Sequence, residues 1–376
     1  MEPGYESHRL VILQTPPPAP QGEDGWGPGK RRCSCATPSR VNLLEPWIFA
    51  RLAAGVAATA LFVQAAWVSL KVMRFFRLGA TSEGQLALER QAELAAAAAR
   101  VGAVLQGAAL LLSLTAADRL SGHLRGAMCG FGVVHAVTTG PAAVIASGLA
   151  SLAALVLGQL LALDRRERSL SLVRPLAAVT TLVAVLGVAD LALTATWLGG
   201  LDFSVVASCC SSGLDAGEDP VRVGLAATGR SLAAALAPAF AAVAAWLAWR
   251  ASRSGRRPAA IAAGLASLVA LPAAVAATVL VVAPHVYEVP QHRCPYCLFR
   301  ADALWMGYPL LAALLVAAAS ALGAALAARW SPRDDGAFAD FAPPLLRRSA
   351  LAWLVALALA LAPVVRYAIL SGGHLL

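Results

Sequence analysis

The chain has 376 residues, of which 59% are hydrophobic and 14% are charged, and its formal net charge is +9. A soluble globular domain has about 25% charged residues, so this composition excludes a soluble enzyme and a disordered chain. The apolar residues form continuous runs of roughly 20 residues, the length that a helix needs to cross a bilayer. Continuous runs also exclude a β-barrel, whose strands alternate apolar and polar residues. We therefore predict an all-α, polytopic membrane protein with short loops, in contact with the lipid bilayer.

Residues 1–46 form a low-complexity tail, in which the stretch TPPPAPQGEDGWGPG cannot build a packed core. The tail lacks the apolar segment of a secretory signal. Because valine can be encoded by an alternative start codon, we expect the working protein to begin near Val41, which leaves residues 1–40 outside it. In the alternative, the tail belongs to the working protein, and one of the predicted spans either does not cross the membrane or is a re-entrant segment.

Residues 47–376 form the transmembrane bundle, with eight predicted spans. In chain order they are about 47–70, 94–117, 141–163, 175–199, 223–249, 259–283, 304–328 and 349–370. A capping-box pattern at Ser82–Gln85 predicts that the second helix starts ahead of its span.

Basic residues alternate between the loops. The loops after spans one, three, five and seven each hold four, namely Lys71, Arg74, Arg77 and Arg90; Arg165, Arg166, Arg168 and Arg174; Arg250, Arg253, Arg256 and Arg257; and Arg329, Arg333, Arg347 and Arg348. Each of the other loops holds two. The positive-inside rule places the richer set in the cytoplasm. Because these charges set topology, we do not expect nucleic-acid binding.

Arginine far outnumbers lysine, which is typical of a high-GC bacterial genome and predicts a bacterial inner membrane.

The cysteines and histidines outside the tail all fall in the outer loops or at the outer ends of spans. They are Cys129, Cys209, Cys210, Cys294, Cys297, His123, His135, His285, His292 and His374. This one-sided distribution predicts chemistry on the outer, periplasmic face.

The stretch from His292 to Cys297, with sequence HRCPYC, places two cysteines three positions apart ahead of span seven. At a helix N-terminus the unpaired N–H groups lower a cysteine pKa below its ordinary value of about 8.5. The segment CPYCL resembles the active-site stretch of bacterial vitamin K epoxide reductase homologues and, more loosely, that of other disulfide-forming membrane oxidoreductases. The resemblance covers five or six residues and implies thiol–disulfide exchange.

A second cysteine element is SCCSSG, with the adjacent residues Cys209 and Cys210, and a third is MCGFGVVH, with Cys129. Adjacent cysteines seldom bond each other, because the bridge would strain the peptide between them.

We therefore predict a transmembrane thiol–disulfide relay. Cys294 or Cys297 attacks, its partner resolves, and Cys209, Cys210 or Cys129 shuttles to a thioredoxin-like protein, while a quinone or that protein takes the electrons.

Two alternatives stay open. Soft sulfur and imidazole ligands suit Cu(I) or Zn(II), which predicts a metal-handling protein served by a metallochaperone. Its ligands are Cys129, His135, Cys209, Cys210, His292, Cys294 and Cys297. The other alternative is a permease or assembly subunit whose cysteines are only structural.

Charged groups inside the spans are expensive and therefore informative. Asp190 falls in the outer half of span four, Arg230 near the outer end of span five, and Arg366 near the outer end of span eight. We predict that Asp190 pairs with Arg230 or Arg366 in an intramembrane charge cluster beneath the cysteine loops.

Overall fold

The computed structural model describes residues 45–75, 83–124, 127–166, 172–202, 220–290, 292–332 and 336–373, without the side chains of 220–227. Within these ranges, eight helices are long and apolar enough to cross a membrane, which confirms the predicted all-α polytopic class.

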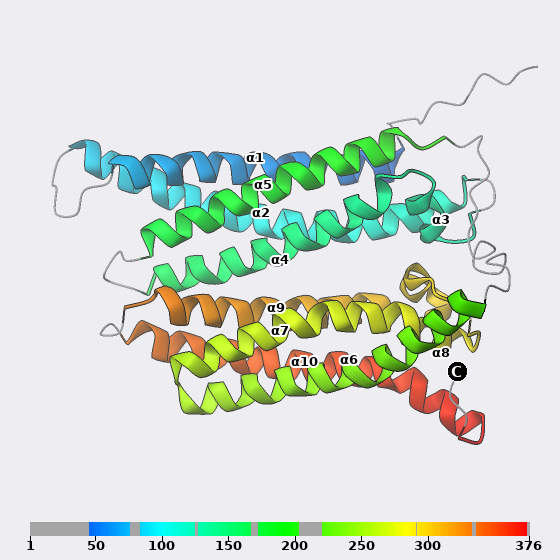
Figure 1. Cartoon of the computed structure of the whole chain (residues 1–376). Coiled ribbons are helices and arrows are strands. Elements are labelled where there is room, and N and C mark those ends of the chain that lie inside the picture. The colour runs from blue at the N-terminus through cyan, green and yellow to red at the C-terminus, as the bar shows by residue number, and fades with distance from the viewer. Residues whose placement is uncertain are drawn as a thin grey trace, which may run out of the picture. The chain divides into compact units, whose positions relative to one another are not determined.

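The eight long helices form two bundles of four (Figure 1). The first bundle contains α1 (Pro46–Phe75), α2 (Glu83–Ser121), α4 (Gly140–Asp164) and α5 (Val173–Gly199). The second contains α6 (Pro220–Ser254), α7 (Arg257–Ala277), α9 (Gly307–Trp330) and α10 (Ala337–Leu370). In each bundle the helices pack in a ring in chain order, and the fourth closes against the first.

Helix α7 continues through one turn of π-helix, η2 (Thr278–Val282), into the short helix α8 (Ala283–Tyr287). The predicted early start of the second helix is confirmed, because α2 begins at Glu83. The predicted seventh span begins later than expected, since α9 starts at Gly307.

The link between the second and third long helices of each bundle lies outside the membrane spans. We call residues 122–139 the first connector and residues 288–306 the second connector. The first contains α3 (Gly130–His135), and the second contains the 3-10 helices η3 (Pro295–Phe299) and η4 (Ala301–Ala303). The two connectors meet through α3 and η3. They therefore bring Cys129 and the Cys294–Cys297 pair to one end of the protein, which we call the cysteine end.

The opposite end is where α1, α4, α6 and α9 finish (Figure 1). We call it the basic end. Among the described residues there, Arg74 closes α1, Arg253 and Arg329 lie in the last turns of α6 and α9, and Arg257 begins α7. The arginine-rich and cysteine-bearing connections therefore lie at opposite ends, whichever side of a membrane each faces.

The two bundles pack against each other mainly through their third helices, α4 and α9. Leu152, Val156 and Leu160 of α4 share a buried cluster with Ala318 and Ala319 of α9. Small side chains at such a contact let helix backbones approach closely, which is how helices associate in a membrane.

Candidate functional site

Three cysteines form a buried cluster where the connectors meet. The Sγ atoms of Cys129, Cys294 and Cys297 all lie within 4.8 Å of one another, and those of Cys129 and Cys294 are 3.2 Å apart. The three side chains are 1%, 4% and 7% exposed and are present as thiols, not as disulfides. A movement of about 1 Å suffices to bring the sulfur atoms of Cys129 and Cys294 to the S–S bond length of about 2.05 Å.

Contacts between the connectors hold the sulfur atoms in place. Arg300 donates from Nη1 to the carbonyl of Met128, at 2.9 Å, which ties the second connector to the residue before Cys129. Residue 130 has no space for a side chain larger than that of glycine, because a Cβ there would lie 3.0 Å from the ring of Tyr296. Tyr287 at the end of α8 donates its hydroxyl to the carbonyl of Cys297, also at 2.9 Å. The cluster is thus anchored from both bundles.

The thiols differ in protonation. Hydrogen bonds from the side chains of Cys129 and Cys297 lower the pKa of Cys294 to about 4, against the opposing effect of burial. Hydrogen bonds with Cys129 and Cys294, together with burial, raise the pKa of Cys297. Once Cys294 carries the negative charge, a second thiolate beside it is disfavoured, so the reduced cluster holds one thiolate and neighbouring thiols. Within the cluster, Cys294 is therefore the sulfur that most readily carries the negative charge.

The local structure corrects the expected helix setting of the CxxC. Cys294 does not start a membrane helix but precedes the five-residue 3-10 helix η3. The depressed pKa of Cys294 comes first from the adjacent thiols, and not from Arg293 or Arg300.

The two histidines of the predicted metal set lie outside the cluster. Within the described part of the chain, the group around these sulfur atoms consists of the three cysteines alone. His135 stacks on Phe131, and its Nδ1 bonds the carbonyl of that residue. His292 stacks on Tyr287, and burial lowers the pKa of the imidazole. Cys209 and Cys210 lie outside the described residues.

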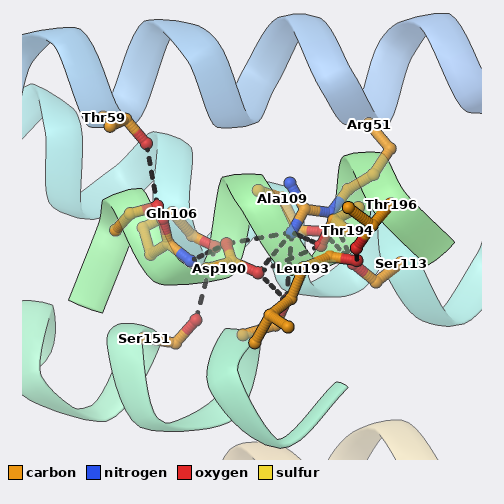
Figure 2. A network of polar contacts seen from close by, with 12 residues as sticks. Arg51, Thr59, Gln106, Ala109, Ser113, Ser151, Asp190, Leu193, Thr194 and Thr196 are labelled. Carbon is orange, nitrogen blue, oxygen red and sulfur yellow. Dashed lines mark hydrogen bonds and ion pairs between the residues drawn. The ribbon is translucent and has the colours of Figure 1, made fainter. Parts of the chain in front are cut away.

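A second polar site lies inside the first bundle, between its helices (Figure 2). Arg51 of α1 forms a buried ion pair with Asp190 of α5, with distances of 2.7 and 2.9 Å from Nη2 to the two carboxylate oxygens. Gln106 of α2 donates to the same carboxylate at 2.9 Å, and Ser147 of α4 also donates to it. All four helices of the bundle therefore contribute to this network.

The predicted charge cluster is consequently wrong in its partners. Asp190 is buried as expected, but it pairs with Arg51. Arg230 donates to the carbonyl of Pro290 at 3.1 Å, and Arg366 forms an exposed pair with Glu288 at 3.3 Å. Both arginines hold the start of the second connector, because Glu288 and Pro290 belong to it.

Two cavities lie within the bundles. One of about 660 Å³ opens between the helices of the first bundle toward the basic end and includes Glu93, Arg100 and Arg165 in its wall. The other, of about 170 Å³, lies among the helices of the second bundle and is lined almost entirely by apolar side chains, with alanine the commonest. Its walls include Val281, Val282 and Val364.

His285 lies one helical turn beyond Val281, and Tyr367 one turn beyond Val364, and their rings touch edge to face. His285 is 4% exposed, its Nδ1 bonds the carbonyl of Val281, and its Nε2 has no hydrogen-bond partner among the described residues. A buried polar atom thus lies close to the apolar cavity, on the cysteine side.

Sequence reasoning overlooked Arg51 and Tyr287. An arginine inside an apolar run was the available signal for Arg51. Nothing in the sequence marked Tyr287, whose role depends on the path of the second connector. Comparisons of the chain with protein-family models, with curated proteins and with solved structures found no match.

Proposed function

We propose that the protein is a membrane thiol–disulfide oxidoreductase whose redox-active pair is Cys294 and Cys297, with Cys129 as a third, exchanging thiol. The observation that carries this proposal is the convergence of the three sulfur atoms, since a CxxC and a thiol from a distant connector lie within 4.8 Å. Thiol exchange needs a thiolate beside a second sulfur, and Cys294 meets both requirements. The cysteine end then faces the periplasm of a bacterial inner membrane.

The reaction balances without any further group. The thiolate of Cys294 attacks one sulfur of an incoming disulfide, such as that of a thioredoxin-like protein, and the other incoming sulfur leaves as a thiolate. Cys297 then gives its proton to the partner thiolate released in the first step and attacks Cys294. The Cys294–Cys297 disulfide forms, the mixed disulfide breaks, the second partner sulfur leaves as a thiolate, and two electrons have passed to the partner. Cys129 can afterwards attack Cys294 and give its proton to Cys297, which leaves as a thiol, so that the disulfide then joins the two connectors.

A lipid-soluble quinone is the second electron acceptor that fits, taking two electrons and two protons to become a hydroquinone. The 170 Å³ cavity supports this choice, because an apolar protein cavity of about 150 Å³ holds one six-membered ring. His285 offers an unpartnered ring nitrogen near the cavity on the cysteine side.

Thiol trapping tests the redox proposal. Cells carrying the full chain with Cys33, Cys35, Cys209 and Cys210 replaced by serine are acid-quenched, and cysteines are tagged with a maleimide that adds mass. We expect three tags under reducing growth and one under oxidising growth. Cys294→Ser removes this change, whereas Cys129→Ser keeps the oxidisable pair. A tag number that is the same in both conditions contradicts the proposal.

Cu(I) binding is the second candidate function, supported by the same three sulfur atoms. Cu(I) favours soft thiolate ligands, whereas structural zinc takes four ligands and the described residues supply three. Titration of the reduced protein with Cu(I) against a chromogenic chelator tests it. We expect the wild-type cluster to hold one equivalent of Cu(I) and Cys297→Ser to lose it. If the maleimide tag is excluded from the cysteines only when copper is present, this function is favoured over the redox one.

A further inference from the structure

The two bundles have the same internal arrangement as well as the same number of long helices. In each, four long helices pack in the same ring order, and a connector outside the spans joins the second helix to the third. The main helix contact between bundles joins equivalent parts, since α4 packs on α9, and α3 likewise packs on η3. Contacts between like parts are the mark of a two-fold arrangement, and parallel repeats in membrane proteins are related by an axis along the membrane normal.

The connectors correspond at the cysteine itself, in the helix that follows it, and at the aromatic residue two positions later. Cys129 is the N-cap of α3 and Cys294 is the N-cap of η3, and both have extended backbones. An aromatic residue follows two positions later in each, Phe131 in the first and Tyr296 in the second. The next position is Gly132 in the first connector and Cys297 in the second.

We infer that the chain consists of two copies of one four-helix unit, and that Gly132 occupies the position of the second cysteine of a CxxC. This inference deepens the proposed function and rests on it for its consequence. Cys129 and Cys294 are then equivalent residues, and their 3.2 Å sulfur contact joins the two copies.

The glycine sets the number of electrons that the site can store. Three thiols can form one disulfide, releasing two electrons and two protons to an oxidant, and always leave one thiol over. The remaining thiol is what attacks the disulfide in the next exchange. Four thiols would close into two disulfides and leave no nucleophile. Gly132 therefore keeps the oxidised site reactive.

Oxidation by diamide of the purified full chain tests the equivalence, with the cysteines at 33, 35, 209 and 210 replaced by serine. Diamide takes two electrons and two protons per disulfide. We expect Gly132→Cys to change from four tagged thiols when reduced to none when oxidised, with a peptide that links positions 129 and 132. Val133→Cys, one residue further along α3 and also buried, is the matched control and keeps two tagged thiols when oxidised.

The reciprocal variant Cys297→Gly gives the second connector the pattern of the first. We expect its two remaining thiols to form the Cys129–Cys294 disulfide, identified as a linked peptide. Should Gly132→Cys behave like its control, or should Cys297→Gly leave both thiols tagged, the equivalence is overturned. Because diamide replaces the cellular oxidant, these outcomes do not depend on redox cycling in cells, whose absence would instead overturn the proposed function.

Discussion

At the residue scale, the chemistry depends on how charge is shared among three sulfur atoms. A thiolate at Cys294 accepts hydrogen bonds from two neighbouring thiols, which lower the pKa of Cys294 to about 4. Alkylation by iodoacetamide requires the thiolate. The labelling rate of Cys294 should therefore be constant from about pH 6 to pH 8 and should fall only as the pH drops through 4. Mass spectrometry of the peptide that contains Cys294 measures this rate.

Cys297→Ala removes one of the two hydrogen bonds to Cys294 and should raise its pKa toward the ordinary value. We expect labelling at pH 4 to slow by about fivefold or more, since raising a pKa of about 4 by one unit lowers the thiolate fraction at that pH from about one half to about one tenth. Thr196→Val, an exposed substitution on α5, is the control and should leave the rate unchanged. A rate in the parent protein that rises tenfold per pH unit up to pH 8 would show that Cys294 is an ordinary thiol.

The sequence predicted the right cysteines but only part of their arrangement. The CxxC spacing and the position of Cys129 marked the three cysteines that cluster, because thiols are rare and their placement was one-sided. The meeting of Cys129 with Cys294 could not be predicted, since 165 residues separate them and the contact depends on how two bundles pack. The same limit applies to Asp190. Arg230 and Arg366 were the expected partners, but the structure pairs Asp190 with Arg51.

At the element scale, the first bundle is held together around one buried ion pair. Arg51 and Asp190 are 0% and 1% exposed, so either charge left alone would be unpaired between helices. We expect Asp190→Asn to destabilise the protein by about 3–5 kcal/mol, the usual effect of removing one partner of a buried pair. Thermal unfolding of the detergent-solubilised protein, followed by circular dichroism, measures the loss.

The double variant Arg51→Met with Asp190→Leu separates the loss of a contact from the burial of a lone charge. Replacing both charges by apolar groups often restores stability, so we expect the double variant to unfold later than Asp190→Asn alone. Thr181→Val is the control, because Thr181 bonds only within its own helix, to the carbonyl of Ala177. Equal melting temperatures for the wild type and Asp190→Asn would mean that the pair contributes little.

Helix positions followed closely from the sequence, but helix grouping did not. Runs of apolar residues fix where a helix can cross a membrane, and eight such helices are present in the described residues. The sequence did not predict that the eight spans divide into two rings of four. Hydropathy does not report which apolar faces meet, because faces toward lipid and toward other helices are alike in character.

At the scale of the whole molecule, the cluster depends on the contact between bundles. Gly323 of α9 faces Gln159 of α4, and a Cβ at Gly323 would overlap the side-chain amide of Gln159. Gly323→Leu should push α9 from α4 at a cost of about 1–3 kcal/mol. We expect the rate of Cys129–Cys294 disulfide formation by diamide, measured in the Cys297→Gly background, to fall about tenfold.

Gly158→Leu is the matched control, since it lies on α4 beside Gln159 and an added Cβ there meets no atom within 4 Å. It should leave the rate of disulfide formation unchanged. Equal slowing by both substitutions would indicate that bulk on α4 or α9, and not the separation of the bundles, controls the sulfur contact.

The Arg51–Asp190 pair also constrains the order in which the chain can be inserted into a membrane. The two residues are 139 positions apart, so α1 leaves the ribosome long before α5 exists. Arg51 lies in the second turn of α1, so until α5 is synthesised its guanidinium can reach the lipid headgroups while α1 spans the membrane. The buried ion pair can form only after residue 190 has entered the membrane, so the first bundle closes around it late in synthesis.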